Sequence, residues 1–115
     1  MCNRFATTGL RGSVIAALWL IATQLPAADI DEARRLAMTG EYDAALQTAA
    51  EAVAANSYGE DWWLLKAEME QTLGRYADAK DTLVAALEKY QWSIRVRARL
   101  RDASRFAGDD ELAAA

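Results

Sequence analysis

The feature that most limits the fold is a short stretch that returns at a fixed interval. The chain reads GEYDAA at 40–45, GRYADA at 74–79 and, less faithfully, GDDELA at 108–113, so that the residue number rises by 34 from each copy to the next. Further positions agree in the same phase, because Ala52 matches Ala86 and the apolar residue after each also recurs. Such a period predicts similar two-helix units, each burying its apolar face against its neighbours.

The repeated residues have expected structural roles. The glycine of each copy should close a first helix in the left-handed conformation, which glycine adopts without the steric penalty of a Cβ. The last alanine of each copy should lie where two helices approach closely, and the tyrosine of the first two copies should help to hold that pair together. The residues assigned to this scaffold are Gly40, Tyr42, Ala45, Ala52, Trp63, Ala67, Gly74, Tyr76, Ala79, Leu83, Ala86, Gly108 and Ala113.

Composition supports helices throughout the repeated part. Alanine dominates the hydrophobic residues, and the single proline is Pro26, so that nothing after it forbids a run of helices. Apolar residues recur at helical spacing within each copy. We expect an all-α fold with helices near 29–39, 42–56, 60–73, 76–90, 94–107 and 109–115.

The pattern G-x-Y-x-x-A, with a small residue seven positions later, resembles the tetratricopeptide repeat. The best copy is WWLLKAEMEQTLGRYADAKDTLVAALEKY, and the resemblance covers 26–115, about two and two-thirds repeats with the third incomplete. It implies a solenoid of helical hairpins whose first helices line a groove that binds a peptide or helix of a partner protein. The inner-face positions that it implies are Leu64, Glu68, Gln71, Thr72, Arg95, Ala98, Asp102 and Arg105.

Several positions depart from that family's pattern. In the second copy, Lys66 and Glu70 replace a usual leucine and a usual aromatic residue. Glu32 and Leu36 stand at the corresponding positions of the first copy. These replacements leave the inner packing of the first helices open and indicate a divergent array.

Residues 1–28 form a separate segment. Two arginines precede an apolar run, SVIAALWLIATQL at 13–25, which is followed by PAAD. This order is typical of a secretory signal, with cleavage expected after Ala28, although Pro26 then occupies a position where a small residue is usual. The alternative is a retained membrane anchor formed by 13–25. The domain of interest is therefore 29–115, exported to the periplasm or beyond the cell.

Residues 94–101 alternate arginine with apolar side chains. Strict alternation is typical of a strand, but the repeat phase and the abundance of good helix formers favour a helix. On a helix, Arg97, Arg101 and Arg105 share one face. One interpretation is a cationic patch on the groove wall that binds carboxylates of a partner. The alternative is a solvated face, or arginines paired with nearby acids such as Glu88, Asp102 and Asp109.

Several chemistries are not supported by the composition. The chain has no histidine and a single cysteine, Cys2, which excludes a disulfide framework and a Cys/His zinc site. The net charge of −4 argues against nucleic acid as a partner. Neighbouring carboxylates such as Glu60 and Asp61 have no histidine or glycine-rich loop beside them, and we interpret them as surface charge.

We therefore expect a non-catalytic protein-interaction module without a cofactor. One alternative is the N-terminal docking arm of a larger enzyme whose catalytic domain lies beyond residue 115. Another is self-association through the open end of the stack. Three tryptophans, Trp62, Trp63 and Trp92, are expected to serve packing rather than to cradle a ligand.

Overall fold

A computed structural model describes residues 29–114, all of whose regular structure is helical. The helices are α2 (Ile30–Met38), α3 (Tyr42–Ala54), α4 (Glu60–Thr72), α5 (Tyr76–Lys89), α6 (Ile94–Ala107) and α7 (Asp110–Ala114). Each expected helix is present, with ends within two residues of the predicted ones. The predictions for segment 1–28 lie outside the described residues. None of the helices described is long and apolar enough to cross a membrane.

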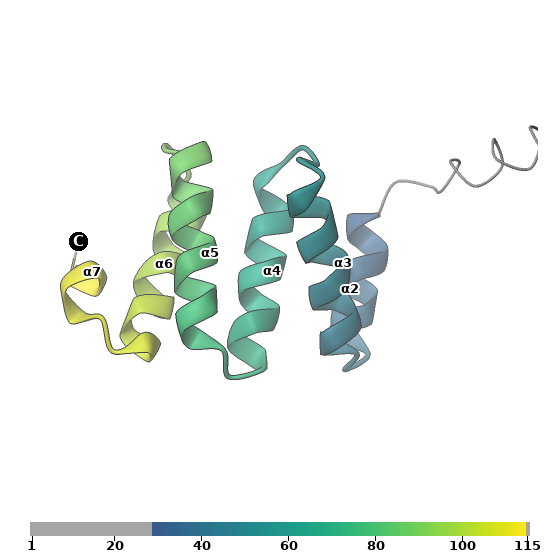
Figure 1. The fold of residues 1–115 in the computed structure, drawn as a ribbon, viewed down its shortest axis with the longest axis horizontal. Helices are drawn as coiled ribbons and strands as arrows, with labels where there is room; N and C mark the ends of the chain where they lie inside the picture. Colours follow the sequence, from purple (N-terminus) through teal and green to yellow (C-terminus); the bar gives the residue numbers. More distant parts are fainter. Residues whose placement is uncertain (1–28, 115) are drawn as a thin grey trace, which may run out of the picture.

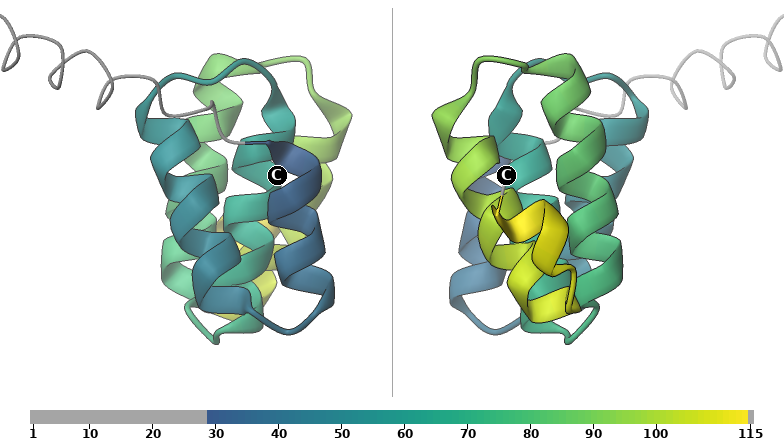
Figure 2. Two further views of the ribbon diagram at one scale, coloured as in Figure 1. Left: turned by 90° about the vertical axis from the view of Figure 1, so that its right-hand side faces the viewer. Right: turned by 90° about the vertical axis from the view of Figure 1, so that its left-hand side faces the viewer.

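Consecutive helices pack side by side as hairpins in a row (Figure 1). Besides these neighbours, α2 contacts α4 and α4 contacts α6. Seen along the row, α2 and α6 lie on one side, α3 and α5 on the other, and α4 lies between them (Figure 2). The alternating arginine stretch belongs to α6, so the helical reading of residues 94–101 is confirmed and the strand reading is wrong.

The helix boundaries repeat with the sequence. Helices α3, α5 and α7 begin at 42, 76 and 110, while α4 and α6 begin at 60 and 94. The three turns before α3, α5 and α7 are also alike, because Gly40, Gly74 and Gly108 have φ angles of 86°, 79° and 78°. In each turn, the N–H after the glycine donates to a carbonyl five residues earlier, as Arg75 N does to Glu70 O at 2.8 Å. The predicted left-handed helix ends are confirmed.

The core consists of two groups of buried side chains that meet on α4. The first group joins α4, α5 and α6 and contains Leu64, Ala67, Ala79, Leu83, Ala86, Val96, Leu100 and Ala103. The second joins α2, α3 and α4 and contains Ala33, Ala45, Ala49, Ala52, Trp62, Leu65 and Met69. Ala113 of α7 is also buried. The repeated alanines thus take the close-packed positions that the sequence predicts.

The aromatic residues depart from expectation. Tyr42 and Tyr76 are 38% and 40% exposed, so neither belongs to the core. Each is the first residue of its helix and lies at the edge of the stack; Tyr76 stacks on Phe106 with 5.6 Å between ring centroids. Trp62 is buried and Trp63 packs partly against the core, but Trp92 is 89% exposed, so the packing prediction for Trp92 is wrong.

The two departures from the repeat pattern in α4 compensate each other. Lys66 Nζ lies 2.8 Å from Glu70 Oε1 and donates to Thr82 Oγ1 of α5 at 2.7 Å. The Thr82 hydroxyl in turn donates to Glu70 Oε1 at 2.7 Å. Glu70 is only 3% exposed, so this network satisfies a buried carboxylate and joins α4 to α5.

The start of α7 is held by a single carboxylate. Asp109 Oδ1 accepts the N–H of Leu112 at 3.1 Å, and Asp109 Oδ2 pairs with Lys80 of α5 at 3.2 Å. The backbone hydrogen bond from Leu112, followed by the contact with Lys80, lowers the pKa of the Asp109 carboxyl. Asp109 therefore pairs with a lysine of α5, not with the arginines of α6 considered from the sequence.

Candidate partner-binding groove

A hollow of about 580 Å³ lies along the first helices of the hairpins. We call it the groove. Its lining comes from α2, α4 and α6 and consists of Arg34, Ala37, Met38, Asp61, Leu64, Leu65, Glu68, Arg95, Ala98, Arg99 and Asp102. Leu64 and Leu65 are almost fully buried, whereas Ala98 is exposed. The groove therefore combines an apolar floor with charged side chains.

A second hollow, of about 700 Å³, adjoins the groove towards the end of α6. Arg99 and Asp102 line both spaces. We call this second space the lower hollow. Its other lining residues are Gln71, Tyr76, Arg105 and Phe106. Together the two hollows extend across α4 and α6 towards the start of α5.

The structure brings together most residues predicted to bind a partner. The groove contains Leu64, Glu68, Arg95, Ala98 and Asp102, and the lower hollow contains Asp102, Gln71 and Arg105. Thr72 lines neither space; its hydroxyl donates to the carbonyl of Glu68 at 2.9 Å within α4. That these residues bind a partner stays a prediction.

Ion pairs cross the groove from helix to helix. Asp61 of α4 lies 3.2 Å from Arg34 of α2 and 2.8 Å from Arg95 of α6. Arg95 also lies 3.1 Å from Glu60. The hydrogen bond to Asp61 raises the pKa of the Arg95 guanidinium. A single carboxylate thus connects the first helices of three successive hairpins.

The charges that line the groove balance. Three lining residues are cationic, Arg34, Arg95 and Arg99, and three are anionic, Asp61, Glu68 and Asp102. Arg99 lies 3.9 Å from Glu68, a longer pair than those of Arg95. The lining residues of the groove therefore carry no net charge, whereas the alternating arginines of residues 94–101 suggested a positive one.

The placement of Arg97 and Arg101 on the groove wall is wrong. Both line a different hollow, of about 300 Å³, with Leu87, Leu100 and Leu112, where α7 meets α5 and α6. Arg97 donates to the carbonyl of Gln91 at 2.7 Å. The reason is helical rotation: about 100° per residue turns Arg97 roughly 200° away from Arg95, nearly to the opposite side of α6.

Two groove arginines were missed from the sequence. Arg34 occupies the same repeat phase as Glu68 and Asp102, so stepping back one repeat from Glu68 would have found it. Arg99 lies one helical turn after Arg95, so the spacing of four residues from Arg95 would have found it. Met38, 86% exposed at the end of α2, carries no sequence signal of its own.

No protein-family model, curated protein or solved structure matches this chain. Within residues 29–114, no group of three or more Asp, Glu or Cys side chains is arranged to hold a metal ion. The local geometry of the groove is therefore the basis for a functional proposal.

Proposed function

We propose that residues 29–115 form a divergent tetratricopeptide-like solenoid that binds a peptide or helix of a partner protein in the groove. The observation that carries the proposal is the continuous surface along α2, α4 and α6. It offers an apolar floor beside paired charges, which is the combination that peptide-recognition grooves use. The recurrence of helix starts and glycine turns at one constant interval supports the repeat assignment.

The charge balance of the groove indicates the chemistry of the partner. A strongly acidic segment would gain from Arg95 and Arg99 but would meet Asp61, Glu68 and Asp102 along the same surface. A segment with apolar anchors and interspersed charges of both signs fits better. Each charge of such a partner can pair with a groove residue of opposite sign and so replace an ion pair that the groove makes within itself. We propose a non-catalytic role without a cofactor, in an exported protein.

Filling the groove tests this proposal. Ala98 is exposed on α6 within the groove, so Ala98→Trp should occupy the floor without disturbing the core. The matched control is Ala85→Trp, at an exposed position of α5 that belongs to neither hollow. Affinity purification with the full chain and both variants, read by quantitative mass spectrometry, identifies proteins that depend on the groove.

The expected result is a partner retained by the wild type and the Ala85→Trp variant and lost by the Ala98→Trp variant. Its affinity, measured with purified protein, should fall at least about tenfold, equivalent to about 1.4 kcal/mol. Equal retention by both variants would contradict binding in the groove, provided that circular dichroism shows unchanged helicity.

A further inference from the structure

A further hollow, of about 380 Å³, lies on the other side of α4 from the groove. We call it the α3–α5 hollow. The backbones of α3 and α5 do not come close to each other, and the space between them opens onto α4 (Figure 2). Its lining consists of Leu46, Ala50, Lys66, Glu70, Arg75, Asp78, Asp81 and Thr82. The volume is within the range of sites that hold small ligands, about 300–1,000 Å³.

The floor of the α3–α5 hollow holds a buried carboxylate with one oxygen left open. Glu70 is almost fully buried, and the hydrogen bonds that it accepts from Lys66 Nζ and from the Thr82 hydroxyl both end on Oε1. Within residues 29–114, no enclosed side-chain polar atom lacks a hydrogen-bond partner. Oε2 of Glu70 is therefore not enclosed, and it is open to the hollow that Glu70 lines. A carboxylate oxygen without a protein donor can accept a strong, charge-assisted hydrogen bond from a ligand.

The lining of this hollow carries a net negative charge. Three lining residues are anionic and two are cationic, namely Glu70, Asp78 and Asp81 against Lys66 and Arg75. Lys66 is already paired with Glu70, and neither Asp78 nor Asp81 forms an ion pair with another residue of 29–114. The lining of the groove, by contrast, is neutral. The α3–α5 hollow therefore favours a cationic ligand.

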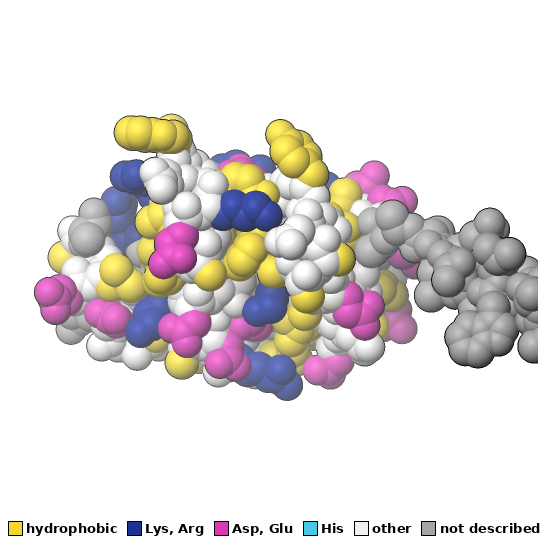
Figure 3. Space-filling view, turned by 45° about the horizontal axis from the view of Figure 1, so that its top comes forward, with side chains coloured by type: hydrophobic (Ala, Val, Ile, Leu, Met, Phe, Trp, Pro, Cys, Tyr) yellow, Lys and Arg dark blue, Asp and Glu magenta, His cyan; other side chains and the backbone are white. Residues whose placement is uncertain are grey.

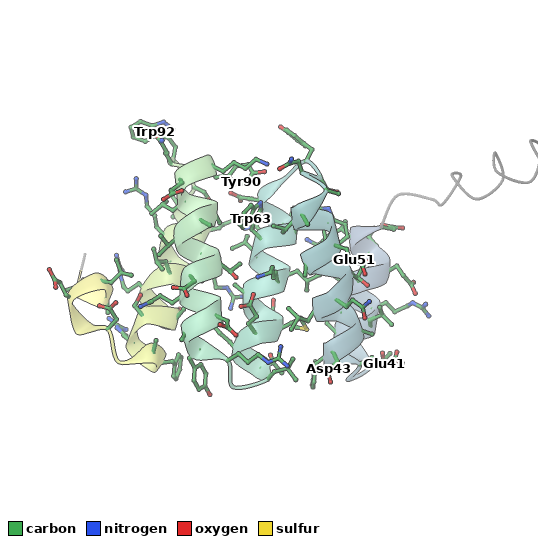
Figure 4. The ribbon with its side chains drawn as sticks, viewed as in Figure 1. Glu41, Asp43, Glu51, Trp63, Tyr90 and Trp92 are labelled. Carbon is green, nitrogen blue, oxygen red and sulfur yellow. The ribbon has the colours of Figure 1, made fainter. Side chains whose placement is uncertain are left out.

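The surface around the hollow adds to its acidic character. Asp43 precedes Leu46 by three residues, so the two share one side of α3, and Figure 4 shows Asp43 at the lower end of that helix. Figure 3 looks onto this side of the molecule and shows acidic and basic side chains interspersed over α4 and α5. The open oxygen thus lies within a charged surface, next to the apolar wall that Leu46 and Ala50 supply.

We propose that the α3–α5 hollow binds a primary ammonium group carried on an aliphatic stem. Leu46 and Ala50 offer the stem an apolar wall, and stems of this kind lie along apolar surface while their charge stays in a polar place. An ammonium is a compact charge with three donors. It suits the single open oxygen of Glu70 together with the rim carboxylates of Asp78 and Asp81.

Other charged ligands fit this hollow less well. A guanidinium binds a carboxylate best through both oxygens, and Oε1 of Glu70 already accepts two hydrogen bonds. A metal ion needs several ligands, and in the described part of the chain no three acidic or cysteine side chains are arranged to hold one. Primary ammonium groups occur on lysine side chains of proteins and on free alkylamines, and both present the same chemistry to the hollow.

This proposal is independent of partner binding in the groove. The groove lies along α2, α4 and α6 and shares no lining residue with the α3–α5 hollow. The groove-filling variant Ala98→Trp should therefore bind amines as the wild type does. Each proposal can fail without the other.

NMR titration of the isotopically labelled full chain at low ionic strength tests the proposal. The probes are n-butylamine, N-acetyl-lysine amide and N-acetyl-arginine amide, and 1-butanol is the uncharged control with the same stem as butylamine. The test variant combines Asp78→Asn with Asp81→Asn, two exposed changes that leave the buried network intact. The matched control combines Glu41→Gln with Glu51→Gln, which remove the same charge from positions on the side of α3 away from α5 (Figure 4).

Butylamine and the lysine derivative should shift the carboxyl carbon of Glu70 and the amides of residues 78–82 to a plateau, while butanol should not. The arginine derivative should bind more weakly than the lysine derivative. The test variant should weaken amine binding about fivefold, as expected for two exposed charge pairs, and the control should not.

The two amine probes also distinguish the sources of the ammonium. Tighter binding of the lysine derivative identifies a protein side chain as the ligand, and equal affinity identifies a free amine. Three results would overturn the proposal: an unmoved Glu70 carboxyl carbon, equal shifts with butanol, or an unchanged affinity in the Asp78→Asn, Asp81→Asn variant.

Discussion

At the scale of single residues, the buried Lys66–Glu70–Thr82 network is the most consequential departure from the repeat pattern. Glu70 is 3% exposed and relies on the Lys66 ammonium and the Thr82 hydroxyl. The desolvation cost of a buried carboxylate is large, and a partner that offsets it becomes indispensable. Lys66 and Glu70, the two departures from the repeat pattern in α4, therefore depend on each other for compensation of their charges.

Removing the cation alone should be costly. Lys66→Leu leaves the Glu70 carboxylate buried with only a hydroxyl partner, and we expect a loss of about 3–5 kcal/mol in the free energy of unfolding. Replacing the whole network, with Lys66→Leu, Glu70→Met and Thr82→Val, should return the stability close to wild type, because no uncompensated polar group remains. Urea denaturation followed by circular dichroism measures both.

The control for this prediction is Lys89→Leu, the same change at an exposed lysine of α5, which should alter stability by no more than about 0.5 kcal/mol. A Lys66→Leu variant as stable as this control would show that Glu70 is satisfied without the ammonium. A triple variant as unstable as the single one would show that the network contributes more than charge compensation.

At the scale of helices, the turns decide how the hairpins repeat. The turn after each first helix contains a glycine at φ near 80°, whereas the turn after α3 contains Asn56 at φ 55°. No atom lies within 4 Å of the place that a Cβ on Gly74 would take, so glycine is needed there for its backbone conformation alone. The same helix-ending hydrogen bonds form with either residue.

We expect Gly74→Ala to destabilise the fold by about 1–2 kcal/mol, the cost of a left-handed conformation for an ordinary L-residue. The matched change is Asn56→Gly, which should be neutral or slightly stabilising, because glycine adopts the same conformation without that cost. Chemical denaturation of the two variants measures the difference. A Gly74→Ala protein with an unchanged midpoint would mean that the turn relaxes to a right-handed form.

The sequence predicted the helices well because local rules determine them. The constant repeat interval located every described helix to within two residues, and the glycines predicted the three left-handed helix ends. The groove was predicted in part: stepping along the repeat phase found Glu68, Arg95 and Asp102, but grouping arginines by spacing misplaced Arg97 and Arg101. Helical rotation alone already places Arg97 roughly 200° from Arg95, so the two cannot share a face of α6. Which of the two faces lines the groove depends on the helices packed against α6, and spacing within one helix does not reveal that.

Pairings between helices were beyond the reach of the sequence for a related reason. Asp61 bridges Arg34 and Arg95 because α2, α4 and α6 place them side by side, while the sequence suggested partners nearer in the chain. Lys66 and Glu70 looked like two separate losses from the repeat, although their spacing of four residues permits a pair. The participation of Thr82 required the packing of α5 against α4.

At the scale of the whole molecule, α4 is the element that joins two otherwise separate cores. Its Leu64 and Ala67 face the group shared with α5 and α6, while Trp62 and Met69 face the group shared with α2 and α3. The backbones of α2 and α3 do not come close to those of α5 or α6, so the packing between the two halves runs mainly through α4. In proteins built from stacked helical repeats, the free energy of unfolding is close to a sum of two contributions: the intrinsic stability of each repeat and the energy of each interface between neighbouring repeats.

Weakening one core should therefore loosen one half of the molecule more than the other. Trp62→Ala removes the largest side chain of the first half's core, at a cost of about 3–5 kcal/mol, and should accelerate amide exchange in α2 and α3 above that in α5 and α6. Leu83→Ala, at about 2–5 kcal/mol, should produce the opposite pattern. Hydrogen exchange read by mass spectrometry resolves the helices separately. Equal acceleration in both halves for both variants would mean that α4 couples the two cores into one cooperative unit, since a single global opening would then expose all the helices together.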